Sequence, residues 1–242
     1  MEKQHVILHL SLIKGIGPHT IQQIIDSISL GHLLDIYSFS LCDWMEKGIS
    51  QKNAYALTVG LKDTSILESE LTLIERYKIQ WTSILSSDYP SQLRHIYLPP
   101  PILYWYGNLH ESQERIAIVG SRKTTSYGKN VIRSVMPDLI NHGFEIVSGG
   151  ALGADTFAHE YALEHKGSTV VVLGSGLSRW YPRENKGLFE RVISNGGALI
   201  SSFPIKTSPH PGNFPARNRI ISGLSKGVIV VQAAHKSGAK IT

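Results

Sequence analysis

Short apolar runs alternate with helical segments through the second part of the chain. The helical segments lie near residues 126–141, 152–165, 184–195 and 216–225, and the apolar runs between and around them are 116–119, 144–147, 169–173, 198–200 and 228–231. Continuous apolar strands separated by helices are typical of a parallel sheet that is covered on both faces. The pattern therefore predicts an α/β fold with a Rossmann-like, doubly wound and mostly parallel sheet.

The first part of the chain has a different pattern, in which short helical segments over residues 5–60 are broken by glycine. Residues 13–24 contain a Gly-x-Gly turn followed by a helix with apolar positions, and resemble a helix-hairpin-helix motif; residues 47–57 look like a degraded second copy. Such a turn can present amides to a phosphate. The alternative is a small helical module without DNA contact. Residues 63–78 are predicted to form a further helix because apolar residues recur at helical spacing.

Residues 81–110 separate these two patterns and are rich in proline and aromatic residues. The run Pro99-Pro100-Pro101 cannot lie inside a helix or a central strand. We therefore expect an irregular connector here, packed on the second domain, with a domain boundary near residue 80. The predicted domains are a helical one over 1–80, of helix-hairpin-helix or SAM-like type, and an extended Rossmann-like one over 81–242.

Composition is that of an ordinary globular protein, with 42% hydrophobic and 18% charged residues in 242. No apolar run approaches the roughly 18 residues that cross a bilayer, and no secretory signal is evident at the start, so we expect a cytoplasmic protein. The lone cysteine, Cys42, excludes an internal disulfide and a multi-cysteine zinc site. We expect it to be a small buried hydrophobic residue.

Charge is distributed unevenly along the chain. The net charge is +5, but residues 1–84 carry 7 Lys and Arg against 9 Asp and Glu, whereas residues 85–242 carry 17 against 10. The basic surplus therefore belongs to the Rossmann-like part, where it favours an anionic partner.

Small residues follow three of the predicted strands. These are Gly120-Ser121 after the first, Ser148-Gly149-Gly150 after the second and Gly174-Ser175-Gly176 after the third. Ligands of doubly wound sheets bind at the carboxyl ends of the strands, where glycine and free amides suit phosphate oxygens. A dinucleotide fits poorly, because Gly-x-Gly-x-x-Gly is missing and no carboxylate follows the second strand. We predict an anionic ligand and no cofactor.

Basic and aromatic side chains flank these loops. Arg122 follows the first strand directly, and the last helix begins with Phe214-Pro215-Ala216-Arg217-Asn218-Arg219. Arginines that follow phosphates and a ring that stacks on a base suit single-stranded nucleic acid. Two alternatives stay open: Phe214 plugs the core, and Arg219 forms an internal ion pair. Lys206 is more consistent with a solvated loop lysine.

Asp155 and His159 lie four residues apart on one helix face and resemble a metal-ligand or acid–base pair. No third ligand or nucleophile accompanies them, so we expect Asp155 to tie down the glycine loop and His159 to pack or hydrogen-bond. No hydrolase signature is present, and we predict that the protein is not an enzyme.

Several of these motifs occur together, in one order, in a known family. They include Tyr89-Pro90, Gly120-Ser121-Arg122, Ser148-Gly149-Gly150-Ala151 with Asp155 and His159, Tyr181-Pro182, and the run from Phe214 to Ser225. Over residues 85–242 the chain resembles the DNA-processing protein A family (DprA/Smf), and the helical first module is similar to that family's usual first domain.

The resemblance implies a domain that binds single-stranded DNA without converting it, that protects incoming DNA during natural transformation, and that loads the RecA recombinase. It also implies a homodimer. Together with Gly120 from the strand-end argument, the candidate DNA-binding residues are Gly120, Ser121, Arg122, Gly149, Gly150, Ala151, Phe214, Arg217, Asn218 and Arg219.

The chain departs from the family pattern near its end. Gln232 stands where an acidic residue is common, Lys240 where an apolar one is common, and the sequence stops at Thr242 before the family's usual last helix and strand. We therefore expect the dimer and recombinase contacts to be weakened. The alternative function is that of a nucleotide-binding Rossmann enzyme such as a nucleoside-monophosphate phosphoribohydrolase, although the Pro-Gly-Gly-x-Gly-Thr-x-x-Glu run of that group is missing. A scaffold acting through protein contacts is a third possibility.

Overall fold

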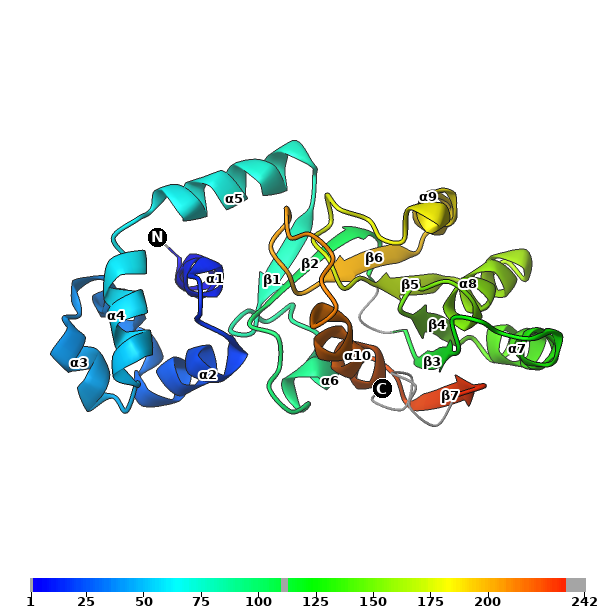
Figure 1. Ribbon diagram of the computed structural model, residues 1–242, viewed down its shortest axis with the longest axis horizontal. Coiled ribbons are helices and arrows are strands. Elements are labelled where there is room, and N and C mark those ends of the chain that lie inside the picture. Colours follow the sequence, from blue (N-terminus) through cyan, green and yellow to red (C-terminus); the bar gives the residue numbers. More distant parts are fainter. Residues whose placement is uncertain (1, 110–112, 234–242) are drawn as a thin grey trace. The chain divides into compact units, whose positions relative to one another are not determined.

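A computed structural model describes residues 2–109 and 113–233 of the chain (Figure 1). The chain forms two compact units: residues 1–89 with 97–103, and residues 90–96 with 104–242. The predicted division into 1–80 and 81–242 stays a prediction. Within the described residues, no helix is both long enough and apolar enough to cross a membrane.

The first unit is mainly helical, which confirms the predicted helices over 5–60 and 63–78. Its helices pack around a shared apolar interior, with Leu10, Ile24 and Trp44 fully inside. The Gly-x-Gly turn joins the first two helices, as the helix-hairpin-helix pattern predicts. The helices are α1 (Lys3–Leu12), α2 (Pro18–Ser27), the 3-10 helix η1 (Leu30–Ser38), α3 (Leu41–Glu46), α4 (Gln51–Gly60) and α5 (Ser65–Arg76).

Cys42 is exposed, so the expectation of a buried cysteine was wrong. Cys42 lies on the short helix α3, two residues before Trp44, which is fully buried. Residues two apart on a helix point to nearly opposite sides, so a buried Trp44 turns Cys42 toward solvent.

The predicted irregular connector over 81–110 contains regular structure. Strand β1 (Gln80–Ser83), helix α6 (Ser91–Arg94) and strand β2 (Ile102–Gly107) lie at its start, middle and end. The three prolines come directly before β2, where their missing N–H groups interrupt no ladder. Proline therefore delimits a strand here, and the prediction of an irregular segment was wrong for its last part.

The sheet has seven strands in the order β1-β2-β6-β5-β4-β3-β7. Five neighbouring strands run parallel, and β2 pairs antiparallel with β6, opposing Trp105 to Ile200. Every residue of β4, β5 and β6 is buried, as expected for strands covered on both faces. The parallel strands are β3 (Arg115–Gly120), β4 (Glu145–Ser148), β5 (Thr169–Val172), β6 (Ala198–Ser201) and β7 (Gly227–Val231).

Helices connect the parallel strands and cover both faces of this sheet, which confirms the doubly wound, mostly parallel fold. Helices α7 (Ser126–Asn141), α8 (Ala154–Glu164) and α9 (Lys186–Ser194) carry the chain from β3 to β6 and lie on one face (Figure 1). Helix α10 (Asn213–Gly223) packs on β5 from the other face and leads back to β7. Right-handed crossovers require this arrangement, because the chain reverses direction between β6 and β7. The order of connections changes between β3 and β7, which makes the loop after β3 a topological switch point.

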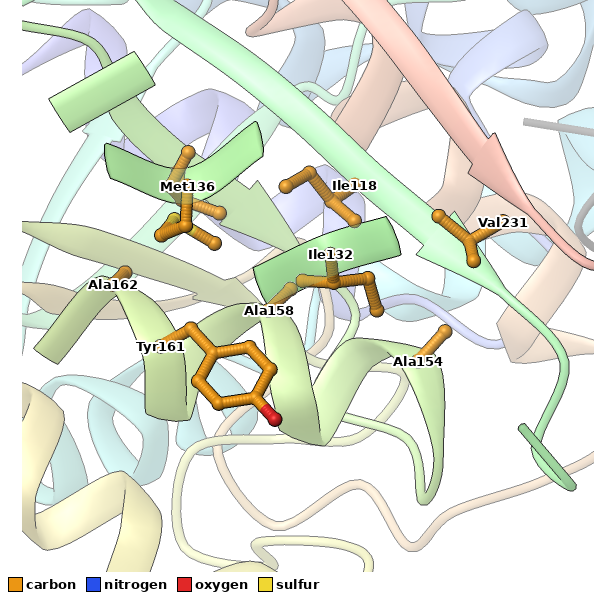
Figure 2. Close-up of a cluster of buried hydrophobic side chains, with 9 residues drawn as sticks. Ile118, Ile132, Met136, Ala154, Ala158, Tyr161, Ala162 and Val231 are labelled. Carbon is orange, nitrogen blue, oxygen red and sulfur yellow. The ribbon is translucent and has the colours of Figure 1, made fainter. Parts of the chain in front are cut away.

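The core between α7, α8 and β3 combines large side chains from α7 with three alanines and Tyr161 from α8 (Figure 2). Ile132 and Met136 of α7 lie one turn apart and are fully buried. Alanines recur at four-residue spacing on α8, which lets that helix approach the sheet closely. The cluster comprises Ile118, Ile132, Met136, Ile146, Ala154, Ala158, Tyr161, Ala162 and Val231.

A buried ion pair joins the amino ends of β3 and β4. Arg115 and Glu145 are register partners in the sheet, and Arg115 Nε donates to Glu145 Oε2 at 2.6 Å with both side chains almost fully buried. Ser168 Oγ donates to the other carboxylate oxygen at 2.6 Å. A buried charge needs its partner, since desolvation costs several kcal/mol for each ion.

We predict that Glu145→Leu destabilises the protein by about 3–5 kcal/mol, because it removes the buried carboxylate to which Arg115 Nε donates. The double variant Arg115→Met, Glu145→Leu removes both charges and is expected to recover most of that loss. Urea unfolding followed by circular dichroism measures both. If the double variant is no more stable than Glu145→Leu, the pair is not coupled as described.

Candidate functional site

The carboxyl ends of β3, β4 and β5 meet at one edge of the sheet, and the first turns of α10 lie against them. Asn213 Nδ2 donates to Gly174 O at 3.1 Å, which fixes the start of α10 to the loop after β5. The predicted strand-end loops are therefore brought together with the Phe214–Arg219 segment.

Arg217 binds the ends of two strands rather than facing solvent. Its side chain is 4% exposed, and its Nη1 donates to Gly149 O at 2.5 Å and to Val172 O. Its Nε donates to Asn218 Oδ1 at 3.2 Å. Burial lowers the pKa of Arg217 to about 10, with Asp155 opposing the shift and Arg122 adding to it. The guanidinium therefore stays charged at neutral pH and holds β4, β5 and α10 together.

Gly149 is required by this close approach. A Cβ atom built on Gly149 would lie 2.5 Å from Arg217 Nη1 and 2.6 Å from Nη2. Such distances are far below van der Waals contact, so a side chain at 149 would displace the guanidinium. The small residue in the loop after β4 thus makes room for a protein side chain.

The amides of the same loop bind a carboxylate of the protein itself. Asp155 Oδ2 accepts from Ala151 N at 3.2 Å. Burial raises the pKa of Asp155, while the charge of Arg217 and hydrogen bonds from the Ala151 and Gly149 amides oppose the rise. Asp155 ties down the glycine loop as expected, and it occupies amide groups that were predicted to face a phosphate.

The other candidate glycines also contact the interior. A Cβ atom on Gly150 would meet Val171 and Phe189 within 3 Å, and one on Gly120 would meet the carbonyl of Val231. Gly150 is buried, whereas Gly120 and Ser121 are partly exposed. Ser121 at the switch-point loop accepts the Lys123 amide on its Oγ at 3.1 Å.

Phe214 lies at the centre of the exposed part of this edge. A Cβ atom on Gly174 would lie 2.7 Å from the Phe214 ring, so the ring rests on that glycine. Arg122 Cζ lies 5.6 Å and Arg217 Cζ 6.0 Å from the ring centroid. Phe214 is half-buried, Arg122 is exposed and Arg217 is buried. The Phe214 ring therefore has one exposed and one buried guanidinium group near it.

Arg219 and Arg217 do not share a helix face. Residues two apart on α10 point about 200° away from each other, and Arg219 is half-buried, as is Asn218. The guanidinium contacts that the structure gives to the Phe214 ring come from Arg122 and Arg217. Lys206 is exposed, in agreement with a solvated loop lysine.

Tyr181 belongs to this site and was not singled out from the sequence as a candidate. It lies in the loop after β5, and its ring centroid is 5.9 Å from that of Phe214. Tyr181 is 46% exposed. The sequence signal was an aromatic residue within a loop that follows a glycine-rich strand end, but loop position alone does not show which ring it meets.

His159 is a structural residue, as expected. It is fully buried, its Nδ1 lies 2.7 Å from Thr169 Oγ1, and its Nε2 has no hydrogen-bond partner among the described residues. Burial, and then the charge of Arg217, lower the pKa of His159 to about 3. Within 2–109 and 113–233, no group of three or more His, Cys, Asp or Glu is placed to hold a metal ion.

The low pKa of His159 predicts acid sensitivity. Its pKa is about 3 in the fold against 6.5 when exposed, so below pH 6.5 the unfolded chain takes up a proton that the folded chain refuses. Stability is therefore lost as the pH falls from 6.5 toward 3, by up to about 1.4 kcal/mol per pH unit.

The His159→Asn variant removes the titratable ring and can keep the bond to Thr169. Between pH 7 and pH 5, we expect its free energy of unfolding to fall by about 2 kcal/mol less than that of the unsubstituted protein. Urea unfolding at both pH values measures this. His165→Asn at the exposed end of the same helix is the matched control and should leave the pH dependence unchanged. Equal pH dependence in all three proteins would contradict a buried neutral His159.

The end of the chain holds two departures from the expected family pattern. Gln232 is described: its Oε1 accepts the Thr125 amide at 2.9 Å and its Nε2 donates to Thr125 Oγ1 at 2.5 Å, which fixes the start of α7. Lys240 lies outside the described residues.

Comparisons with known proteins agree with this architecture. The chain is 47% identical over 160 residues to Protein Smf of Synechocystis, which is 64% of this chain and 40% of that one. It is 43% identical over 161 residues to the DNA processing protein DprA of Bacillus subtilis, which is 66% of this chain and 54% of that one. The chain thus spans about half the length of the curated relatives it matches.

Two solved structures share the fold. DNA processing protein A of Streptococcus pneumoniae superposes with a TM-score of 0.74 and 32% identity, covering 93% of this chain and 81% of that one. DNA processing protein A of Helicobacter pylori, whose structure concerns a single-stranded DNA binding mode, superposes with a TM-score of 0.60 and 32% identity, covering 67% and 74%. The model of the family described as DNA recombination-mediator protein A matches residues 80–242. These matches confirm the resemblance to DprA/Smf proteins, and the chain belongs to the DNA recombination-mediator protein A family.

Proposed function

We propose that the protein binds single-stranded DNA at the edge formed by Arg122 and Phe214, without converting it. The observation that carries the proposal is the exposed Arg122 guanidinium 5.6 Å from the half-buried Phe214 ring. A cation at this place attracts a phosphate, and the ring offers a surface to a base. The net basic charge of residues 85–242 favours the same partner.

The relatives support this proposal. Proteins named DNA processing protein share 42–43% identity with this chain over about two thirds of it, and the H. pylori relative binds single-stranded DNA. We extend the proposal to protection of incoming DNA, loading of a RecA recombinase and homodimer formation, each of which was predicted from the family resemblance. We also propose a cytoplasmic location, which was predicted from the apolar pattern of the sequence.

Of the ten predicted DNA-binding residues, we propose that Arg122, Phe214 and Ser121 contact the strand. We propose that Gly149, Gly150, Ala151, Arg217 and Asn218 act by shaping the edge, because their contacts are with the protein itself. Gly120 positions the loop at the switch point, and Arg219 stays a predicted contact.

A nucleotide-cleaving enzyme is the alternative function. The titratable side chains of this edge do not favour a cleavage reaction. Asp155 is hydrogen-bonded to the backbone, and His159 is buried beside Thr169. A glutamate placed to assist cleavage has not been identified from the sequence. Release of free base from nucleoside monophosphates by the purified protein would overturn the proposal.

We predict that the affinity of the full chain for single-stranded oligonucleotides falls steeply with salt, because bound cations are exchanged for phosphate contacts. Arg122→Ala should weaken binding to all sequences and lower the salt slope by about one phosphate. Fluorescence anisotropy with labelled oligonucleotides at several salt concentrations measures both quantities.

Arg191→Ala is the matched control for this variant. Arg191 is exposed in the last turn of α9, which precedes the amino end of β6 and so lies at the opposite edge of the sheet. The Arg191→Ala substitution removes the same charge as Arg122→Ala and should leave the salt dependence of the affinity unchanged. Equal effects of the two substitutions would show that general charge, and no site at Arg122, attracts the DNA.

We also predict that Phe214→Ala weakens binding by about 1–3 kcal/mol, whereas Phe214→Trp keeps it, since base stacking needs a ring of either kind. Thermal unfolding of both variants separates loss of stacking from loss of the contact with Gly174. Unchanged affinity in a folded Phe214→Ala protein would return this residue to a packing role.

A further inference from the structure

We infer that Tyr181 is a second base-stacking surface of the site, so that the edge holds at least two nucleotides of a strand. This rests on the proposed function and deepens it. Tyr181 and Phe214 come from different elements, the loop after β5 and the first turn of α10, yet their ring centroids are 5.9 Å apart.

The two rings differ in what already covers them. The Phe214 ring rests on Gly174 and has both Arg122 and Arg217 within about 6 Å of its centroid. Tyr181 is 46% exposed, and its recorded ring contact is with Phe214. A base that reaches this edge therefore finds more open ring surface on Tyr181 than on Phe214.

The loop that carries Tyr181 is held firmly on both sides of it. Trp180 packs edge-on against Phe189 of α9 with 6.2 Å between centroids, and Pro182 is buried. Earlier in the loop, Ser175 Oγ donates to Arg179 O at 2.7 Å, and Ser178 Oγ donates to Ile205 O at 2.7 Å. An exposed ring between anchored neighbours loses little conformational entropy when a ligand binds.

The relative orientation of the rings suits two bases rather than one. The planes of Tyr181 and Phe214 are tilted by 43°, so a single flat base cannot lie parallel to both. Two consecutive bases of a flexible single strand can tilt independently, and each can stack on its own ring. A mononucleotide would use one ring at most.

Two arginines lie close to Tyr181 in the sequence. Arg179 and Arg183 lie two residues before and after Tyr181, and both are exposed. These two exposed side chains add positive charge to the loop that carries Tyr181, and positive charge favours the phosphates of a bound strand.

The test compares Tyr181→Ala and Tyr181→Phe in the full chain, with anisotropy of a labelled oligothymidine and of an abasic oligonucleotide of equal length. Tyr181→Ala is expected to weaken oligothymidine binding at least fivefold, which corresponds to the lower limit for stacking of one base. Tyr181→Phe should stay within twofold. Binding of the abasic strand should not change in either variant.

Tyr55→Ala is the matched control, because Tyr55 is a still more exposed tyrosine on α4 in the first unit. A Tyr181→Trp protein supplies a second readout: its extra fluorescence should be quenched by oligothymidine and not by the abasic strand. If the unsubstituted protein binds no single-stranded DNA, the proposed function itself fails. If it binds but Tyr181→Ala binds equally well, or the tryptophan is not quenched, the second surface does not exist.

Discussion

The architecture of the site depends on one buried guanidinium. Arg217 enters from α10 and donates to backbone carbonyls after β4 and at the end of β5, so one side chain joins the helix to two strand ends. A buried charge of this kind is tolerated only when oxygen atoms surround it and an opposite charge lies near. Asp155 supplies that charge, and its carboxylate in turn fixes the glycine loop through the Ala151 amide. Removing Asp155 takes away the negative charge near Arg217, and removing Arg217 takes away the positive charge near Asp155.

This arrangement separates two kinds of residue that look alike in the sequence. Small residues and arginines cluster at the strand ends, and all of them suggest phosphate binding when read in one dimension. In the fold, Gly149, Asp155 and Arg217 satisfy one another, and the outward-facing chemistry falls to Arg122 with the Phe214 and Tyr181 rings. The inner group supplies rigidity, and the outer group supplies the charge and aromatic surface on which the proposed function rests.

Much of the fold could be predicted from the sequence, because buried parallel strands and their covering helices leave a strong apolar pattern. The five strands of the parallel part were all expected, and no end is shifted by more than one residue. Strand β2 was missed because it directly follows three prolines and pairs antiparallel with β6, which lies almost a hundred residues further along the chain. Cys42 was misplaced because a six-residue helix is too short for its buried face to be read from periodicity.

The site was predicted less completely, for a physical reason. Periodicity shows that Arg217 and Arg219 lie on different faces of one helix, but it does not show which of them points inward. That depends on carbonyl oxygens 45 and 68 residues earlier in the chain. Tyr181 was likewise recognised as part of a motif, while its neighbour Phe214 lies 33 residues further on. Long-range contacts of this kind leave no local signature.

The inner cluster also bears on how the protein tolerates change. Selection of a variant library for folding alone would remove substitutions at Gly149, Asp155 and Arg217. It would accept substitutions at Arg122 and Tyr181, because these two side chains are exposed and contribute little to the interior. A screen for capture of nucleic acid would hold all five. Comparison of the two screens would separate residues that are needed for the fold of this surface from residues that are needed only for binding. A list of substitutions that abolish binding does not make this distinction.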